Sequence, residues 1–185
     1  MEVQMHIVVL HGSPRKGMNS DTFADSFLKG IHEKANHTVA HFYLNDMNIR
    51  PCQGCFSCNS DHTCVINDDM QEIYREFQKA QIIVFATPMY WGYLTAQMKI
   101  AVDRLEALAG KPFHGKTFVV LITHRYHYES TVAFFERVCP YFKVDLHSLV
   151  CKTLNSETDE DIPIQRCPDC LRRAYELGQF LGKRL

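Results

Sequence analysis

The sequence lacks a long hydrophobic run, and it lacks an excess of charge of either sign. No stretch approaches the roughly 20 apolar residues that cross a bilayer. Lys and Arg number 20 and Asp and Glu 21, which gives a formal net charge of −1. Such a chain has no strong field to attract a nucleic-acid backbone or an anionic lipid surface. We therefore expect neither a nucleic acid nor a membrane among its partners.

The start of the chain also lacks the signature of a secretory leader. Met1 to Met5 reads MEVQM and carries no basic segment, and the apolar run Ile7–Leu10 is too short for a signal-peptide core. We expect a cytoplasmic, reducing setting. In that setting, clustered cysteines among the eight in the chain indicate a metal, an iron–sulfur cluster or redox chemistry rather than a disulfide framework.

The apolar content is high enough for a full-sized core. Hydrophobic residues make up 46% of the 185 residues, which predicts a single domain over residues 1–185. Short apolar runs alternate with helical periodicity. The predicted strands are residues 5–10, 39–44, 81–86, 117–123 and 142–150, and the predicted helices are residues 20–35, 68–80, 95–108, 129–138 and 163–181. This alternation predicts an α/β fold with a parallel sheet covered by helices on both faces.

The loop after the first strand resembles an anion seat. It reads His11-Gly-Ser-Pro-Arg-Lys-Gly-Met-Asn-Ser20 and enters a helix that Asn19 or Ser20 is expected to cap. Backbone N–H groups, the helix dipole and hydroxyl groups suit a phosphate dianion at this place. The loop matches neither the Walker A pattern nor G-x-G-x-x-G. An ordinary capped turn is the alternative interpretation.

The loop after the third strand carries unusually large side chains. Thr87 to Thr95 contains Met89, Tyr90, Trp91 and Tyr93, which suit stacking on a planar ring or, alternatively, filling of the core or of a dimer interface. The carboxyl ends of parallel strands form one ligand-binding edge. The two loops together therefore indicate a nucleotide with a large planar ring. His124 to Tyr128, after the fourth strand, adds hydrogen-bond donors and cationic capacity.

Three stretches resemble the flavodoxin-like NAD(P)H-dependent FMN reductase family. The first is Gly12-Ser-Pro-Arg15 with Asn19-Ser20. The second is Thr87-Pro-Met-Tyr-Trp-Gly92, continuing to Asp103-Arg104. The third is Pro51 to Cys58 with Cys64 and Asp68-Asp69-Met70, which resembles the cysteine loop of the iron–sulfur flavoprotein branch.

The resemblance implies a three-layer sandwich with a five-stranded sheet in the order 2-1-3-4-5 and FMN at its carboxyl edge. It also implies a homodimer or homotetramer and NAD(P)H as reductant. The implied FMN ligands comprise phosphate-loop, ring-loop and later-loop residues: Ser13, Arg15, Asn19, Ser20, Pro88, Met89, Tyr90, Trp91, Gly92 and His124. A positive group beside the pyrimidine ring would favour reduced flavin. No side chain is expected to act as a catalytic acid or base.

Four cysteines stand in one loop after the second strand. Cys52, Cys55, Cys58 and Cys64 read C-x2-C-x2-C-x5-C, a spacing that can hold a 4Fe–4S cluster, a zinc ion or only free thiols. The loop is expected at the same sheet edge as the flavin. Cys167-Pro-Asp-Cys170 forms a second pair at the start of the last helix, which we interpret as structural, with reactive thiols or a shared metal site as alternatives.

Two functional hypotheses follow, and a third is weaker. The first is an FMN-dependent NAD(P)H oxidoreductase that reduces a small acceptor such as a quinone, a nitro or azo compound or free flavin. The second is an iron–sulfur flavoprotein that accepts electrons from ferredoxin. The third is a nucleotide-binding or redox-sensing module without turnover.

Overall fold

The fold is built on a parallel sheet of five strands. The computed structural model describes residues 4–33 and 35–183. The parallel strands are β1 (His6–His11), β2 (Thr38–Tyr43), β3 (Ile82–Tyr90), β5 (Thr117–His124) and β6 (Asp145–Lys152). They pair in the order β2-β1-β3-β5-β6, so the predicted order is confirmed. The short strand β4 (Tyr93–Leu94), which pairs antiparallel with the end of β3, was not predicted.

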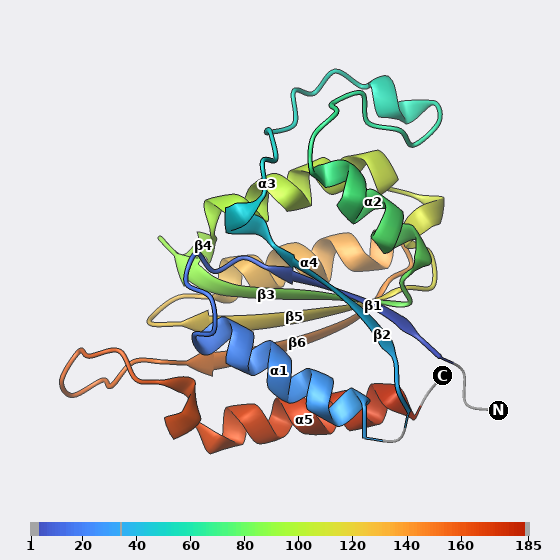
Figure 1. Cartoon of the computed structure of the whole chain (residues 1–185). Coiled ribbons are helices and arrows are strands. Elements are labelled where there is room, and N and C mark those ends of the chain that lie inside the picture. The colour runs from blue at the N-terminus through green and yellow to red at the C-terminus, as the bar shows by residue number, and fades with distance from the viewer. Residues whose placement is uncertain (1–3, 34, 184–185) are drawn as a thin grey trace.

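Helices cover both faces of this sheet (Figure 1). On one face lie α1 (Asn19–Ile31) and α5 (Pro168–Gly182). On the other lie α2 (Met70–Lys79), α3 (Ala96–Arg104) and α4 (Glu129–Tyr141). Each layer buries its own apolar cluster, because β1, β3 and β5 are apolar on both faces. The predicted three-layer sandwich is confirmed.

Helices α1 and α5 approach each other unusually closely. A Cβ atom on Gly178 would lie 2.1 Å from the Phe27 carbonyl oxygen, and one on Gly30 would lie 2.0 Å from the Tyr175 carbonyl oxygen. No side chain fits at either position. This contact fixes the C-terminal half of α1 against the C-terminal half of α5.

Several predicted ends are displaced in the structure. The predicted helix 20–35 ends at Ile31, and residue 34 lies outside the described residues. Neither Asn19 nor Ser20 is the N-cap, which is Met18. Instead, the Asn19 amide bonds the backbone of Ile162 and Ile164, and the Ser20 hydroxyl bonds Thr123. Both side chains have tertiary partners that outcompete the local cap.

Other boundaries differ because tertiary pairing extends or tightens the element. β3 continues to Tyr90, since the hairpin with β4 prolongs it beyond the predicted Ala86. The predicted helix 95–108 changes to a 3-10 helix at Leu105–Leu108, and the helix predicted from Pro163 begins as the 3-10 turn Ile164–Arg166. The predicted strand 142–150 is shifted to β6, Asp145–Lys152.

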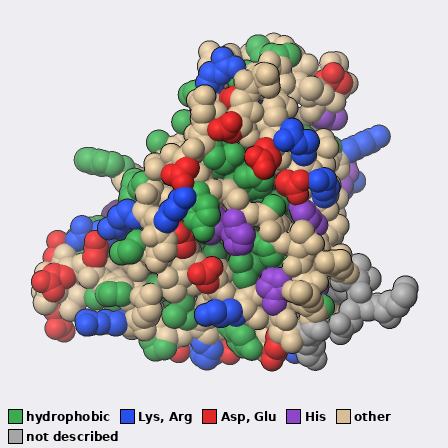
Figure 2. Space-filling model, viewed as in Figure 1, with side chains coloured by type: hydrophobic (Ala, Val, Ile, Leu, Met, Phe, Trp, Pro, Cys, Tyr) green, Lys and Arg blue, Asp and Glu red, His purple; other side chains and the backbone are tan. Residues whose placement is uncertain are grey.

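Charged side chains of both signs are interspersed over the face seen in Figure 2, in keeping with the nearly neutral chain. Acidic side chains gather at the tip of the loop formed by residues 155–161. Within residues 4–33 and 35–183, no helix is long and apolar enough to cross a membrane. The first three residues of the MEVQM segment, which suggested the absence of a leader, lie outside the described residues.

Candidate functional site

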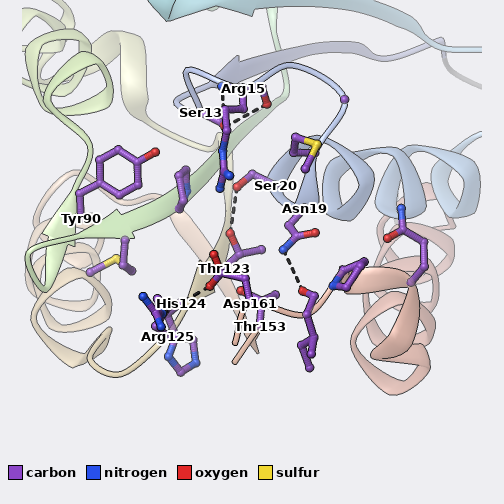
Figure 3. A pocket seen from close by; sticks show the side chains of 17 residues that line it. Ser13, Arg15, Asn19, Ser20, Tyr90, Thr123, His124, Arg125, Thr153 and Asp161 are labelled. Carbon is purple, nitrogen blue, oxygen red and sulfur yellow. Dashed lines mark hydrogen bonds and ion pairs between the residues drawn. The ribbon is translucent and has the colours of Figure 1, made fainter. Parts of the chain in front are cut away.

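A cavity of about 330 Å³ opens at the carboxyl edge of the sheet (Figure 3). This volume lies at the lower end of the range for small-molecule sites. Its wall comes from the loop after β1, the ends of β3 and β5, and the chain after β6. The lining residues are Ser13, Arg15, Gly17, Met18, Asn19, Ser20, Pro88, Met89, Tyr90, Thr123, His124, Arg125, Thr153, Asp161, Ile162, Pro163 and Gln165.

The α1 end of the cavity is suited to an anion. Helix α1 begins at Asn19, and no described side chain caps its first turn. The first N–H groups of a helix have no partner within the helix and carry the positive end of its dipole. The buried hydroxyl of Ser20, at 2.9 Å from that of Thr123, lies at the same wall.

A buried carboxylate holds the shape of this loop. One oxygen of Asp21 accepts the Gly17 N–H at 2.7 Å, and the other lies 2.8 Å from Nδ1 of His11. Ser13 acts within the loop, because its hydroxyl accepts the Arg15 N–H at 3.1 Å and donates to the Arg15 carbonyl oxygen. Ser13 and Asp21 therefore position the backbone on which an anion would rest.

Arg15 supplies positive charge at this wall. Its side chain extends from the loop into the cavity (Figure 3). No described carboxylate pairs with Arg15, whereas Arg125, on the opposite wall, pairs with Asp159 and Asp161. The neighbouring Lys16 points elsewhere, since it pairs with Asp46 and lies over the Tyr43 ring. Arg15 is thus the lining cation left for a ligand.

Apolar side chains of the β3 end form another wall. Pro88, Met89 and Tyr90 line the cavity, and 42% of Tyr90 remains exposed. Trp91 and Gly92 do not line the cavity. Both adopt positive φ, 51° and 73°, in the two-residue turn between β3 and β4, as a type I′ hairpin requires. Trp91 is fully exposed at this tip, so its predicted contact with a flavin stays a prediction.

His124 reaches the cavity from the end of β5. Its Nδ1 is buried and meets no hydrogen-bond partner among the described residues. Burial lowers the pKa of His124, and the weaker effect of the Tyr126 backbone does not reverse this. The imidazole is therefore neutral at pH 7, and the cationic capacity expected of this loop resides in Arg125. A ligand polar atom would satisfy the orphaned nitrogen.

The sequence interpretation missed part of the wall. Thr123, Thr153 and the segment from Asp161 to Gln165 line the cavity but carry no recognised motif. The position of Thr123 at the end of a predicted strand could have indicated it. The segment after β6 could not have been found, because the Asn19 amide ties it to α1 only in the folded chain.

The cysteine loop does not lie at this cavity. None of the eight cysteines, all in described positions, lines it. The loop sits outside the α2–α3 layer instead (Figure 1), where Cys58 and Cys64 pack on the apolar cluster of that layer. The expectation that the loop shares the flavin edge within one chain is wrong, because the chain after β2 runs over the helices rather than along the edge.

The four thiols of this loop are not arranged as a metal site. Among the described residues, no three His, Cys, Asp or Glu side chains are gathered to hold a metal ion. Cys52 and Cys55 are exposed, and the Ser57 hydroxyl donates to the Cys55 sulfur at 3.4 Å, which lowers the pKa of that thiol. The side chains as placed do not fit a 4Fe–4S cluster.

A buried ion pair joins the two ends of the loop. Arg104 donates to both carboxylate oxygens of Asp68, at 2.7 and 3.1 Å, and to the carbonyl oxygens of Arg50 and Ile66, at 2.8 and 3.4 Å. Burial alone would raise the pKa of Asp68, but Arg104 and two backbone N–H groups outweigh it, so the pKa is lowered. This pair anchors the cysteine loop to α3.

Comparison with known proteins identifies relatives. A family model described as NADPH-dependent FMN reductase matches residues 5–138. An iron–sulfur flavoprotein of Methanosarcina thermophila is 38% identical over 109 residues, 59% of this chain and 56% of that protein. One from Archaeoglobus fulgidus is 33% identical over 108 residues, 58% of this chain and 49% of that protein. The matched region spans about half the length of these relatives.

A solved structure supports the fold over the whole chain. The NAD(P)H:quinone oxidoreductase from Methanothermobacter marburgensis superposes with a TM-score of 0.72 at 16% identity, covering 99% of this chain and 100% of that one. The flavodoxin-like arrangement predicted from the sequence is therefore confirmed as a fold.

Proposed function

Because the chain belongs to the NADPH-dependent FMN reductase family, we propose that the cavity binds FMN and that the protein is an FMN-dependent NAD(P)H oxidoreductase. The observation that carries the proposal is the uncapped start of α1, which faces the cavity beside the unpaired Arg15. The phosphate would rest on the N–H groups of this helix start and on Arg15. Bound FMN would supply hydride acceptance and electron transfer.

The residues around the cavity have positioning roles in this proposal. Pro88, Met89 and Tyr90 would line one side of the flavin ring and exclude water from it, as apolar and thioether groups do. His124 would offer its orphaned nitrogen to a polar atom of the ring. No carboxylate or imidazole is needed as an acid or base, since the flavin carries the chemistry.

The acceptor that we propose is a small molecule: a quinone, a nitro or azo compound, or free flavin. An open cavity with an exposed Tyr90 at its rim supports a molecule that reaches the flavin from solution. We further propose that residues 1–185 act as one domain in a cytoplasmic homodimer or homotetramer. The exposed Trp91 at the β3–β4 turn is the feature that supports association near the cavity.

A titration with two flavins tests the binding site. Arg15→Gln should weaken FMN binding by about 10- to 100-fold, which corresponds to one charge-assisted hydrogen bond of about 1.5–3 kcal/mol. Riboflavin, which lacks the phosphate, should bind both proteins equally. Quenching of flavin fluorescence measures both affinities.

Lys16→Gln is the matched control, because it removes the same charge from the same loop but from a side chain that points to Asp46. Its FMN affinity should stay within a few-fold of wild type. Equal losses for FMN and riboflavin in Arg15→Gln would contradict a phosphate contact. A protein that stays colourless after FMN is added would overturn the whole proposal.

A second candidate rests on the cysteine loop. The relatives named iron–sulfur flavoproteins and the grouping of Cys52, Cys55, Cys58 and Cys64 support an electron carrier that accepts electrons from ferredoxin. Iron and sulfide analysis of anaerobically purified protein tests it. Iron and sulfide near zero after reconstitution would eliminate this candidate and leave the first intact.

A further inference from the structure

Three cysteines that are distant in the sequence meet on the α1–α5 side of the sheet. Cys151, in β6, is completely buried in the apolar cluster of this layer. Cys167 immediately precedes α5 and Cys170 lies in its first turn, and both are partly buried against the same cluster. The Cys151 thiol has a raised pKa, because it is buried and because the thiols of Cys170 and Cys167 lie beside it. It is therefore the central thiol of the three.

Backbone contacts hold the end of β6 and the start of α5 together. The Cys167 thiol donates to the carbonyl oxygen of Lys152, the residue after Cys151, at 3.6 Å. The Cys170 N–H donates to the Cys167 carbonyl oxygen at 3.0 Å. Pro168 occupies the first position of α5, where its fixed φ suits the helix start. The three thiols thus lie on a well-connected part of the chain.

We propose that Cys151, Cys167 and Cys170 form a redox-active thiol site in which Cys170 reacts with a small disulfide and Cys151 resolves the product as an internal Cys151–Cys170 disulfide. The substrate class is a low-molecular-weight disulfide such as glutathione disulfide. This site lies apart from the FMN cavity, since none of its cysteines lines that cavity. It does not depend on the proposed oxidoreductase activity.

The two exchange steps balance. The Cys170 thiolate attacks one sulfur of glutathione disulfide, breaks its S–S bond and releases the first glutathione thiolate. The Cys151 thiol then attacks the Cys170 sulfur and breaks its bond to the second glutathione, and the Cys151 proton passes to that departing sulfur. The protein loses two electrons, and glutathione disulfide gains them. The two protons released by the protein end on the two glutathione thiols.

The assignment of roles follows from burial and contacts. Cys151 is completely buried and burial raises its pKa, so it can act only second, on a sulfur that is already bound beside it. The Cys167 thiol is engaged with Lys152, and burial raises the pKa of Cys167, which lowers its thiolate fraction. Cys170 is then the thiol left for the first attack.

Tryptic peptides separate the pairings cleanly. Cleavage after Lys143, Lys152, Arg166 and Arg172 leaves Cys151 in peptide 144–152, and it leaves Cys167 and Cys170 together in peptide 167–172. The folded protein is treated with glutathione disulfide, its remaining thiols are alkylated, and the digest is analysed by mass spectrometry. We expect the two peptides linked to each other, with Cys167 alkylated, and the link should disappear after dithiothreitol.

Variants test the resolving role. Cys151→Ser should accumulate glutathione on Cys170, because the internal attack is lost, and Cys170→Ser should form no link between the two peptides. Cys139→Ser removes another buried thiol, on α4, and should give the same linked peptides as wild type. Cys170 is partly exposed, so its serine variant keeps the test usable if Cys151→Ser fails to fold.

Three results would overturn the proposal. A link confined to peptide 167–172 would remove Cys151 from the reaction. Unmodified thiols after prolonged treatment would show that the site is inert. Stoichiometric zinc in the purified protein, with all three thiols protected from alkylation until a chelator is added, would show a metal site instead.

Discussion

The buried pair of Arg104 and Asp68 offers a direct test of how the cysteine loop is held. Replacing Arg104 with Met keeps most of the aliphatic volume but removes all four hydrogen bonds of the guanidinium. Arg104 is 1% exposed, so solvent cannot replace these partners. The carboxylate of Asp68 is left buried, with the N–H groups of Arg50 and Met70 as its remaining donors and the Arg50 guanidinium 4.0 Å away.

The magnitude follows from what is left unpaired. Breaking a buried ion pair by removing one partner costs about 3–5 kcal/mol, because the other charge remains without compensation. The two surviving N–H donors and the largely exposed Arg50 guanidinium reduce this penalty, whereas the abandoned carbonyl oxygens of Arg50 and Ile66 add to it. We therefore expect Arg104→Met to lower the free energy of unfolding by about 4 kcal/mol, or about 8–16 °C in Tm.

Urea unfolding followed by far-UV circular dichroism measures this loss. Lys99→Met is the matched control, because it also removes a cation from α3. Lys99 pairs with Asp103 at the surface rather than with a buried carboxylate. That change should cost less than about 1 kcal/mol. Asp68→Asn and the double variant complete a cycle in which the paired changes should cost less than their sum. A loss for Arg104→Met no larger than that for Lys99→Met would refute the reasoning.

Three further predictions concern packing, pH and a buried hydroxyl. Gly178→Ala should lower Tm by about 6–12 °C, since its new methyl group meets the Phe27 carbonyl oxygen and the helices must separate at a cost of about 3 kcal/mol. Differential scanning calorimetry measures this change, and an unchanged Tm would contradict the close contact. The pKa of Asp68 is lowered on folding, so its pair with Arg104 stabilises the protein fully above the unfolded pKa, and that stability is lost as the pH falls below about 5. Urea titrations from pH 7 to pH 3 should show a steeper fall in the free energy of unfolding for wild type than for Asp68→Asn, and parallel curves would exclude this linkage. Thr123→Val should lower the free energy of unfolding by about 1–3 kcal/mol, because the buried Ser20 hydroxyl loses its partner. Chemical denaturation measures this change, and an unchanged free energy would mean that Ser20 finds another partner.

In both main loops of the candidate site, the sequence indicated the place of the loop but not the contacts of its individual side chains. The loop after β1 was identified from small residues, hydroxyls and Arg15 between a strand and a helix, all of which are local features. The tertiary contacts of its side chains were not. Asn19 and Ser20 were expected to cap α1, but their side chains bond Ile162, Ile164 and Thr123, which are more than 100 positions away. Their contact with a phosphate stays a prediction.

The ring loop shows the same division. Its large side chains were visible in the sequence, but β3 continues through Tyr90 and turns at Trp91 and Gly92. Pro88, Met89 and Tyr90 consequently face the cavity, whereas Trp91 is exposed at the tip. An alternation of apolar residues cannot indicate where a hairpin ends the strand, since this depends on a two-residue turn with positive φ.

The sequence by itself determined the order of strands and helices, the covered parallel sheet and the loop that would receive an anion, because these depend on periodicity and on residue types that are adjacent in the chain. Only the tertiary structure decided that the cysteine loop lies over α2 and α3, that Arg104 joins its two ends, and that Cys151 meets Cys167 and Cys170. Each of these is a contact between segments far apart in the sequence. Such contacts follow from the packing of whole layers, which no local pattern encodes.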